Sequence, residues 1–569
     1  MPVQAMHDIK TKFKKATSTG KGKIILLLIF ILISSVIAGG IHYWNTYKKQ
    51  IIRGKLEDTV REKTSGLYLL RYDTLKLDEV AGDLLITNIR LVYDSVKYHA
   101  LQKTNDAPAI LIKLNIESLE VSGVKTPRAL IDKEIVGKKI HIRNPSIQIL
   151  YTNEGRDSSR VVPDKDVYEQ ILGHLNMIKV DTVEISGAEI VTRTLKTGKE
   201  NVQLKNTFIR LIDVAVDSAA SKDKSRLAFA RQIFLSAERI SWKAENGLYT
   251  YVSDSIEINT AEKSAYAKNF LIKPTLSENA FVKSLPTQDD RFDFSFNSIA
   301  IYDLNMPDLF NEQITADSVH IKSASLKIYR DISIPRDKKN RVGLYPHQAL
   351  GKIPVPIKIK KIILPNTFVE YKEKNPRSNQ AGKVQFYNTH ATLTNVTNDK
   401  EAIRENNTLT AEITTRFLNK TSLNVVWQFY LMHPKGRFDV KGNLGPMRFA
   451  DANVVTEPMG PAKLEEGRLN NLHFKLEGND YDTHGTVKML YEDLKVAVLE
   501  KEKGSKKLDK KTVASIAANI IIKNSNPVND KDDPKIVTVQ MERNTNRSIF
   551  YLVWKSLLKG IKETSGIKN

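Results

Sequence analysis

The sequence predicts a mainly β protein with an N-terminal transmembrane helix, an elongated and curled antiparallel β-sheet, few further helices and a C-terminal amphipathic helix. Three observations predict this class. Residues 24–44 form one apolar run without a charged side chain, apolar and polar residues alternate over most of the chain after residue 66, and residues 549–561 show a helical period. A period of two is typical of strands with one dry face, and a spacing of three or four is typical of amphipathic helices.

The apolar run Ile24–Trp44 is long enough to cross a bilayer. Its twenty-one residues read IILLLIFILISSVIAGGIHYW. They make about 31 Å of helix at about 1.5 Å per residue, against a hydrocarbon core of roughly 30 Å. An alternative is a signal peptide cleaved near Ala38, but the run continues past that residue. We therefore expect an uncleaved anchor, marked along its length by Ile24, Phe30, Ile37 and Trp44.

The charges that flank this run predict its orientation. Six lysines and one acid precede it, and the basic residues that follow are fewer and more widely spaced. Because basic residues favour the cytoplasmic side of a membrane, residues 1–23 are expected to be a cytoplasmic tail and the large body to lie outside. Residues 45–65 then form a juxtamembrane amphipathic helix, since Ile52, Leu56 and Val60 recur at a spacing of four.

Composition excludes several classes of site and partner. The chain has no cysteine, so it contains no disulfide, thiolate metal site or cysteine nucleophile. The net charge is +22, but residues 1–55 hold ten basic residues against one acid, and residues 501–569 hold fifteen against seven. A nucleic-acid-binding body would concentrate its basic residues on the readout surface. We therefore expect no nucleic-acid partner, and basic ends suit anionic lipid surfaces better.

Residues 66–420 repeat a unit of two short strands separated by a break. In Ile140–Ile149 the break is Asn144-Pro145, and in Val183–Ile190 it is Gly187. The same unit returns at 319–328 and at 357–371. Because the spacing between copies is irregular, this is a degenerate supersecondary repeat and not a strict solenoid period.

Residues 421–500 are predicted to form a second β-region, with longer and more apolar strands. All odd positions from Leu423 to Leu431 are apolar and can share one face, and strands near 469–476 and 486–498 are similar. The inward set of these late strands is our candidate apolar lining. Its members are Leu423, Val425, Trp427, Phe429, Leu472, Phe474 and Leu476.

The C-terminal residues predict a basic linker over 501–548 and an amphipathic helix over 549–563. Phe550, Val553, Trp554 and Leu557 lie on the apolar half of a helical wheel, and lysines cluster opposite. Such a helix suits a lipid interface. An equally weighted alternative is a helix that plugs one end of the β-body.

No catalytic motif is present. The chain has no H-E-x-x-H pair and no G-x-S-x-G turn, so we expect no enzyme, no cofactor and no metal site. The dry face of an antiparallel sheet must nevertheless be covered, and few helices are predicted to cover it. The sheet can curl into a groove whose apolar lining shelters acyl chains, or it can close into a packed core.

Several stretches resemble the AsmA-like family. They are Gly66–Leu69 with Leu85–Leu91, Ile116–Val121, Gly137–Ile147, Lys358–Tyr371, and Gly436–Gly442 with Gly467–Phe474, and the tail Phe550–Thr564 resembles that of related anchored proteins from Bacteroidota-type bacteria. The resemblance implies an inner-membrane anchor with a cytoplasmic N-terminus, and a periplasmic β-taco with a hydrophobic groove. It also implies a role in moving phospholipid toward the outer membrane or in envelope homeostasis, and no catalytic residues.

Two functions therefore stay open at this point. The first is a protein that shields phospholipid acyl chains in an apolar groove, with membrane lipids as its partners. The alternative is a structural or assembly factor that acts on outer-membrane or periplasmic proteins through pairing at a sheet edge. A negative charge at Phe429 or Phe474 would separate an open groove from a closed core, because only the closed core would unfold.

Overall fold

The computed structural model describes residues 57–566, apart from 126–131, 153–171, 173–174, 377–379, 502–507, 511–522 and a few shorter gaps. The predicted anchor 24–44 and most of the predicted helix 45–65 lie outside the described residues. Within the latter range, residues 57, 58 and 60–62 are helical and Val60 is buried. Among the helices of the described ranges, none has both the length and the apolar character that crossing a membrane requires.

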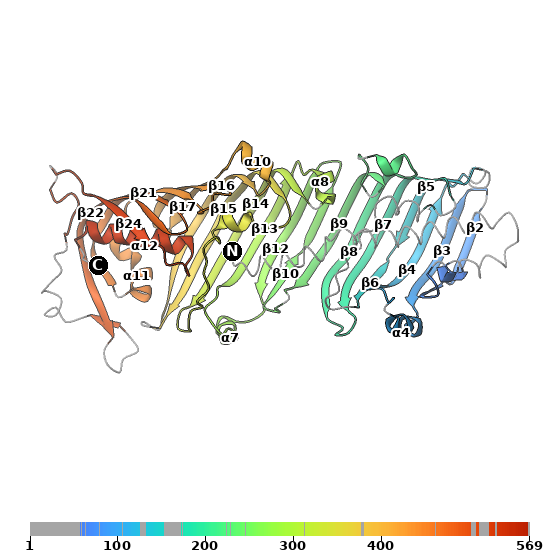
Figure 1. The fold of residues 1–569 in the computed structure, drawn as a ribbon, viewed down its shortest axis with the longest axis horizontal. Coiled ribbons are helices and arrows are strands. Elements are labelled where there is room, and N and C mark those ends of the chain that lie inside the picture. The colour runs from blue at the N-terminus through green and yellow to red at the C-terminus, as the bar shows by residue number, and fades with distance from the viewer. Residues whose placement is uncertain are drawn as a thin grey trace.

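The prediction of a mainly β protein is confirmed. A single sheet of 24 strands runs along the long axis of the molecule, and the strands follow one another in sequence order from the blue end to the red end (Figure 1). We divide it into three sections. The N-terminal section contains β1 (Tyr68–Arg71), β2 (Thr74–Asp78), β3 (Asp83–Tyr93), β4 (Ile110–Ser122), β5 (Glu134–Arg143), β6 (Ser146–Tyr151), β7 (Met177–Thr194) and β8 (Glu200–Val216).

The middle section contains β9 (Ala230–Lys243), β10 (Tyr249–Ser253), β11 (Ser255–Asn259), β12 (Ser264–Pro274), β13 (Arg291–Tyr302) and β14 (Ile314–Asp331). The C-terminal section contains β15 (Ile357–Asn375), β16 (Gln380–Thr397), β17 (Thr408–Phe417), β18 (Thr421–Tyr430), β19 (Phe438–Leu444), β20 (Met447–Arg448), β21 (Ala462–Gly478), β22 (Asp482–Lys501), β23 (Leu508–Lys510) and β24 (Ile536–Glu542).

Short helices lie between the strands in sequence and after the last strand. They are α4 (Ser95–Lys103), α7 (Glu278–Lys283), α8 (Met306–Phe310), α9 (Pro346–Leu350), α10 (Lys400–Glu405), α11 (Asn453–Met459) and α12 (Ile549–Thr564). The longest of these, α12, packs against β22 and β24. Each of α4, α7, α10 and α12 begins after a capping Asp or Ser whose side chain accepts a hydrogen bond from a backbone N–H of the first turn.

The predicted antiparallel pairing holds for most neighbours, but two junctions are parallel. β5 and β6 both pair parallel with β7, and β14 pairs parallel with β15. A parallel pair needs a connection that crosses from one end of the strands to the other. The segment 332–356 is such a crossover between β14 and β15. The sequence did not reveal these junctions, because the direction of a long-range pair leaves no local signal.

Two predicted boundaries also differ from the structure. The sheet continues without a break from β17 to β18, across the boundary expected between 420 and 421. The range 501–548, predicted as a linker, contains β24, which pairs with β22 and extends the sheet. The alternation of Val537 and Val539, both buried, was the signal for this strand.

The breaks of the predicted repeat lie along one line, which we call the crease. Asn88, Asn144, Gly187, Asn206 and Asn366 have left-handed backbone conformations with φ between 43° and 67°, which Gly and Asn adopt most readily. Each occupies the register position next to the break in the neighbouring strand, as the pairings around Ile185–Ala188 and Leu364–Thr367 show. The line therefore crosses the sheet from β3 to β16.

The crease also changes which residues face inward. In β5 and β6 the buried residues are Ile140 and Ile142 before the break but Ile147 and Ile149 after it, so the parity switches. An extra residue at a β-bulge has this effect and bends the strand. The crease thus divides the sheet into a first wall, which carries Ile142, and a second wall, which carries Ile147, with the apolar side chains of both on one inner face. Small residues, including Ala188, Thr207, Ala237, Ala324 and Thr367, are buried at the bend.

Candidate functional site

The first wall carries an apolar row that crosses the whole sheet. Register pairing links one residue of each strand that it crosses, from β2 to β24, and only Gly485 lacks an apolar side chain. We call this the long row: Leu75, Ile86, Leu119, Ile142, Ile185, Ile209, Leu235, Ile258, Ala265, Ile301, Val319, Ile362, Leu393, Ala411, Trp427, Val440, Leu476, Gly485 and Val539.

The second wall carries a comparable row that is rich in aromatic side chains. Its members are register partners from β4 to β17, and all but Thr192 are apolar or aromatic. We call this the aromatic row: Ile112, Ile149, Thr192, Val202, Trp242, Tyr251, Ile272, Phe294, Leu326, Val369, Phe386 and Phe417.

In the N-terminal section the two walls pack against each other. Ile86, Leu119 and Ile142 of the long row are at most 2% exposed. They belong to one hydrophobic cluster with Ile112 and Ile149 of the aromatic row. This part of the sheet is therefore a closed core, like that of a β-sandwich.

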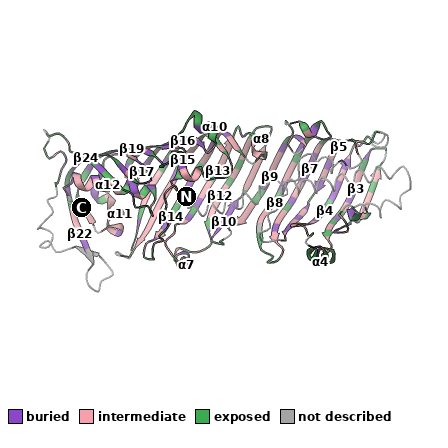
Figure 2. Ribbon diagram, viewed as in Figure 1, coloured by how far each residue is buried: buried purple, intermediate pink, exposed green. Residues whose placement is uncertain are grey.

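In the middle section the same rows are less covered. Ile258 and Ile301 of the long row are half-buried, as are Trp242, Ile272 and Leu326 of the aromatic row. Figure 2 shows the change, since intermediate burial prevails along β12, β13 and β14. The residue types are as apolar as in the N-terminal section, so the difference lies in what covers them.

The two walls of the middle section belong to separate hydrophobic clusters. The second-wall cluster centres on Tyr251 and Phe294, and the ring of Trp242 stacks on that of Tyr251 at a centroid distance of 5.0 Å. The first-wall cluster centres on Leu304 and Met306. No described residue belongs to both. The inner faces of the two walls are thus apolar without forming a common core.

Charged and polar side chains border the aromatic row at the outer end of the second wall. Arg330 Nε donates to Asp290 Oδ1 at 2.6 Å, and the hydroxyl of Tyr371 donates to Glu373 Oε2 at 2.7 Å. Burial raises the pKa of Tyr371 far above its usual value, so this hydroxyl remains a donor at all physiological pH values. The wall therefore passes from an apolar floor to a polar rim.

In the C-terminal section, α12 covers the first wall. Ile549, Leu552 and Val553 are buried against it. Gly560 allows the close approach, because a Cβ at this position would lie 2.6 Å from the side chain of Val487. The helix therefore takes the place of the second wall at this end and seals the end of the sheet.

The crossover 332–356 is anchored at the same end by a buried polar network. Arg543 and Asp480 form an ion pair whose side chains are 1% and 2% exposed. The Arg543 guanidinium lies 4.2 Å from the ring centre of Tyr345, whose hydroxyl donates to the Asn479 carbonyl at 2.9 Å. Asp480 also accepts from the backbone N–H of Gly343. Crossover, turn and α12 are thus tied into one closing element.

His347 of α9 lies inside this closing element. It is 3% exposed, its ring lies 5.1 Å from that of Phe429, and neither ring nitrogen has a hydrogen-bond partner among the described atoms. Burial lowers its pKa to about 4. The imidazole is therefore neutral at pH 7 and acts as part of the core.

The candidate lining predicted on the late strands lies in the covered C-terminal section. Trp427, Phe429, Leu472, Phe474 and Leu476 are buried in the cluster that includes α12, and Leu423 and Val425 are half-buried. The structure therefore brings these seven together on one face, in surroundings that resemble a filled core.

The residues predicted for an interfacial helix divide between two faces. Val553 is buried and Leu557 is half-buried against the sheet, whereas Phe550 and Trp554 are 61% and 52% exposed. The buried face also includes Leu552. The predicted anchor residues Ile24, Phe30, Ile37 and Trp44 lie outside the described residues.

Sequence reasoning missed the aromatic row of the middle section. The signal was present in Phe292-Asp-Phe294-Ser-Phe296, where aromatic and polar residues alternate strictly. The three phenylalanines share the inner face of β13, and Phe296 lies 5.9 Å from Phe270 of β12. The repeat units were recognised by Gly, Pro or Asn-Pro at the break between their strands. This strand has no Gly or Pro at its break, so it was not recognised in the same way.

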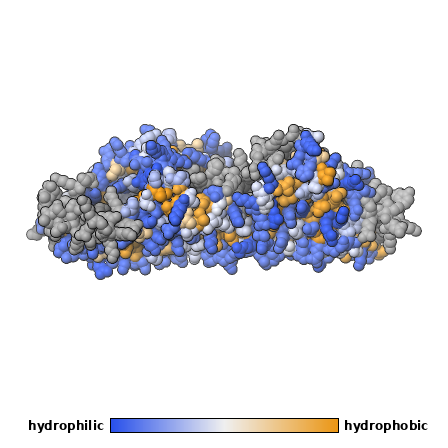
Figure 3. Space-filling model, turned by 90° about the horizontal axis from the view of Figure 1, so that it is seen from below, coloured by the Kyte–Doolittle hydropathy of each residue, from blue (hydrophilic) through white to orange (hydrophobic). Residues whose placement is uncertain are grey.

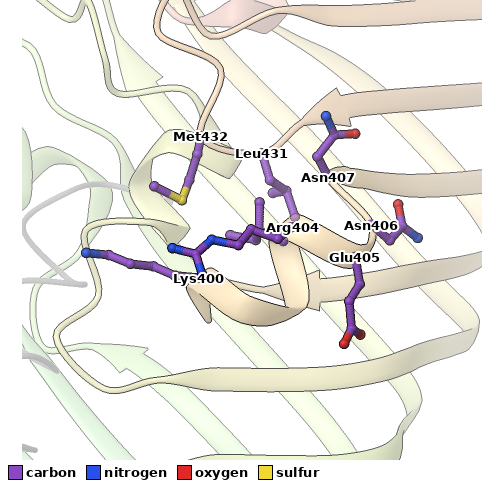
Figure 4. A pocket seen from close by; sticks show the side chains of 8 residues that line it. Lys400, Arg404, Glu405, Asn406, Asn407, Leu431 and Met432 are labelled. Carbon is purple, nitrogen blue, oxygen red and sulfur yellow. The ribbon is translucent and has the colours of Figure 1, made fainter.

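Other surface features are less specific. A cavity of about 600 Å³ lies between α10 and the turn after β18, and its lining of Lys400, Arg404, Glu405 and Met432 is mixed in character (Figure 4). Seen from below, the molecule shows apolar patches in each half of its length within a hydrophilic surface (Figure 3). In the part of the chain that the structure describes, no three His, Asp or Glu side chains are grouped as metal ligands.

The chain was also compared with known proteins. No protein-family model matches it, and no curated protein matches it in sequence.

Proposed function

We propose that the protein shields the acyl chains of phospholipids in an apolar groove formed by the two walls of the middle section. One observation carries the proposal. The long row and the aromatic row stay apolar through β9–β14, and several of their members are only half-buried there, although Val319, Tyr251 and Phe294 are buried; the described residues of the two walls share no hydrophobic cluster. A row of apolar side chains that stays partly accessible to water is a candidate binding surface.

The energetics favour a chain-like apolar ligand. Each methylene that leaves water contributes about 0.8 kcal/mol, so an acyl chain of about fifteen methylenes gains on the order of 10 kcal/mol from such a lining. The aromatic row adds flat apolar ring surfaces against which an acyl chain can lie. A lining without convergent polar groups suits a conduit better than a catalytic site.

The proposed setting follows from the sequence. An inner-membrane anchor at 24–44 would place the body in the periplasm, as the resemblance to AsmA-like proteins implies. The groove would then carry phospholipid toward the outer membrane or serve envelope homeostasis. The protein is not an enzyme in this proposal, because it shelters its ligand without changing it.

Photo-crosslinking in cells tests the proposal with the full chain. A p-benzoylphenylalanine in place of Phe296, on the inner face of the middle section, should capture phospholipid that mass spectrometry identifies. The same substitution at Tyr302, which is 46% exposed, serves as the solvent-facing control. Equal capture at both positions, or none at Phe296, would overturn the proposal. Capture of a β-barrel protein at the edge strand β2 instead would favour the assembly-factor alternative.

A further inference from the structure

The turn that precedes α12 holds an arginine that has no carboxylate partner among the described residues. Arg547 is half-buried, its guanidinium lies 4.3 Å from the ring centre of Tyr551, and its Nε is buried without a hydrogen-bond partner. Within the described ranges no Asp or Glu lies at ion-pair distance from it. A partly desolvated guanidinium without an opposing charge is costly to maintain in a folded protein.

The arginines around this turn are otherwise matched one to one with acids. Arg543 pairs with Asp480, Arg330 pairs with Asp290 and Arg341 pairs with Asp337. Arg547 therefore differs from these neighbouring arginines, because it has no acidic partner among the described residues. The Oδ1 atom of Asn546, the preceding residue, is also buried without a partner.

The position of Arg547 links the closing element to the middle section. Arg341 of the crossover donates its backbone N–H to the Thr545 carbonyl at 2.7 Å and its guanidinium Nη1 to the Asn546 carbonyl at 3.0 Å. The crossover leaves the second wall after Asp331, which follows Arg330 and ends β14. Burial lowers the pKa of Arg547, and the nearby positive charge of Arg330 lowers it further.

We propose that Arg547 binds the anionic headgroup of an amphiphile whose chain lies along the aromatic row of the middle section. A guanidinium presents paired N–H donors that suit the oxygens of a phosphate or a carboxylate. Asn546 Oδ1 would accept a hydrogen bond from a headgroup hydroxyl or ammonium. The headgroup would then rest where the groove meets the closing element, and its charge would balance the surplus guanidinium.

This inference rests on the proposed function and names the ligand class of the same groove. The test uses the full chain in detergent and native mass spectrometry. Wild-type protein and Arg547→Gln are titrated with phosphatidylglycerol, with oleate and with dioleoylglycerol, which has neither phosphate nor carboxylate. Lys555→Gln is the matched control, because it removes the same charge from the neighbouring helix α12 and Lys555 Nζ lies 5.7 Å from the centre of the same Tyr551 ring. Arg547→Lys keeps the charge but loses the paired donors.

The expected result is a loss of about tenfold in phosphatidylglycerol affinity for Arg547→Gln, with partial recovery in Arg547→Lys. Dioleoylglycerol binding and the Lys555→Gln variant should stay unchanged. A loss for oleate as well would extend the site to carboxylates, and no loss for oleate would restrict it to phosphate. Equal losses for all three ligands, or none, would overturn the headgroup site and leave the groove intact. If wild-type protein binds no ligand, the groove itself is refuted.

Discussion

The N-terminal and middle sections are built from the same strand pattern, the same crease and the same apolar rows, yet the rows share one buried core in the former and lie in separate clusters with several half-buried members in the latter. Ile142 and Ile301 are members of one register row and have identical side chains. The former is 2% exposed and packs in a core shared by both walls, whereas the latter is half-buried in a cluster of one wall. Local sequence therefore does not decide how deeply a residue of the row is buried; the residues that cover it do.

A negative charge on the long row should give the largest difference in stability between the two sections. Ile142→Asp buries a carboxylate in a closed core and is expected to cost about 4 kcal/mol of unfolding free energy or more. Ile301→Asp should cost about 1 kcal/mol, because the charge remains hydrated there. Denaturant unfolding of the full chain in detergent measures both. Similar large losses in the two variants would show that the middle section is also a closed core.

Phe474→Asp applies the same unfolding test to the C-terminal section. Its 5% exposure in the cluster that contains α12 predicts a loss close to that of Ile142→Asp. A folded Phe474→Asp protein would instead extend the groove into the late strands, where the sequence placed it.

Asp480→Asn should loosen the closing element. The substitution leaves Arg543 buried without its counter-charge, and breaking such a pair costs about 3–5 kcal/mol. Asp317→Asn is the control, because its ion pair with Lys360 is exposed to solvent and therefore contributes little to stability. The same unfolding experiment applies, and equal effects of the two substitutions would mean that the buried network does not anchor the crossover.

Acid should weaken the closing element through His347. Its pKa is about 4 in the folded protein against 6.5 for an unperturbed histidine, so the unfolded chain takes up this proton first as the pH falls. The stabilisation is complete above pH 6.5 and decreases towards pH 4, by about 3 kcal/mol in total. His347→Leu removes this component, so the difference in unfolding free energy between variant and wild type should change over this range. Parallel pH profiles would contradict the assignment.

The crease crosses the two sections and continues into β15 of the C-terminal section, and a change in it should have the smallest effect. Asn366 has a φ of 52°, a conformation that a β-branched residue adopts at a cost of about 1–2 kcal/mol. Asn366→Val should lower the unfolding free energy by that amount, and Asn366→Gly should leave it nearly unchanged. Equal stability of the two variants would show that the bend does not depend on this conformation.

Much of this architecture could be read from the sequence, because it depends on local pattern. Alternation predicted the strands, and Asn144-Pro145 and Gly187 predicted the breaks that the structure aligns in the crease. The switch from Ile142 to Ile147 was visible as a change of parity. Whether this change of parity marks a turn or a β-bulge could not be read from the sequence, because turns and bulges contain similar residues.

The location of the section with half-buried rows could not be predicted from local sequence patterns. The late strands carry large apolar residues such as Trp427 and Phe429, which made them the natural candidates. What covers them comes from far along the chain, namely α12 and a crossover set by one parallel pair. Long-range pairings of this kind have no local signature, so the half-buried middle section was found only once the strands were aligned in register.

The separation of the walls can be measured directly, because the chain has no cysteine and a single introduced thiol is unambiguous. Maleimide labelling of the full chain is compared for Ile142→Cys and Ile301→Cys, with and without added phospholipid. We predict slow labelling at position 142 under both conditions, and rapid labelling at position 301 that phospholipid suppresses. Slow labelling at both positions, or rapid labelling at 301 that phospholipid does not change, would contradict it.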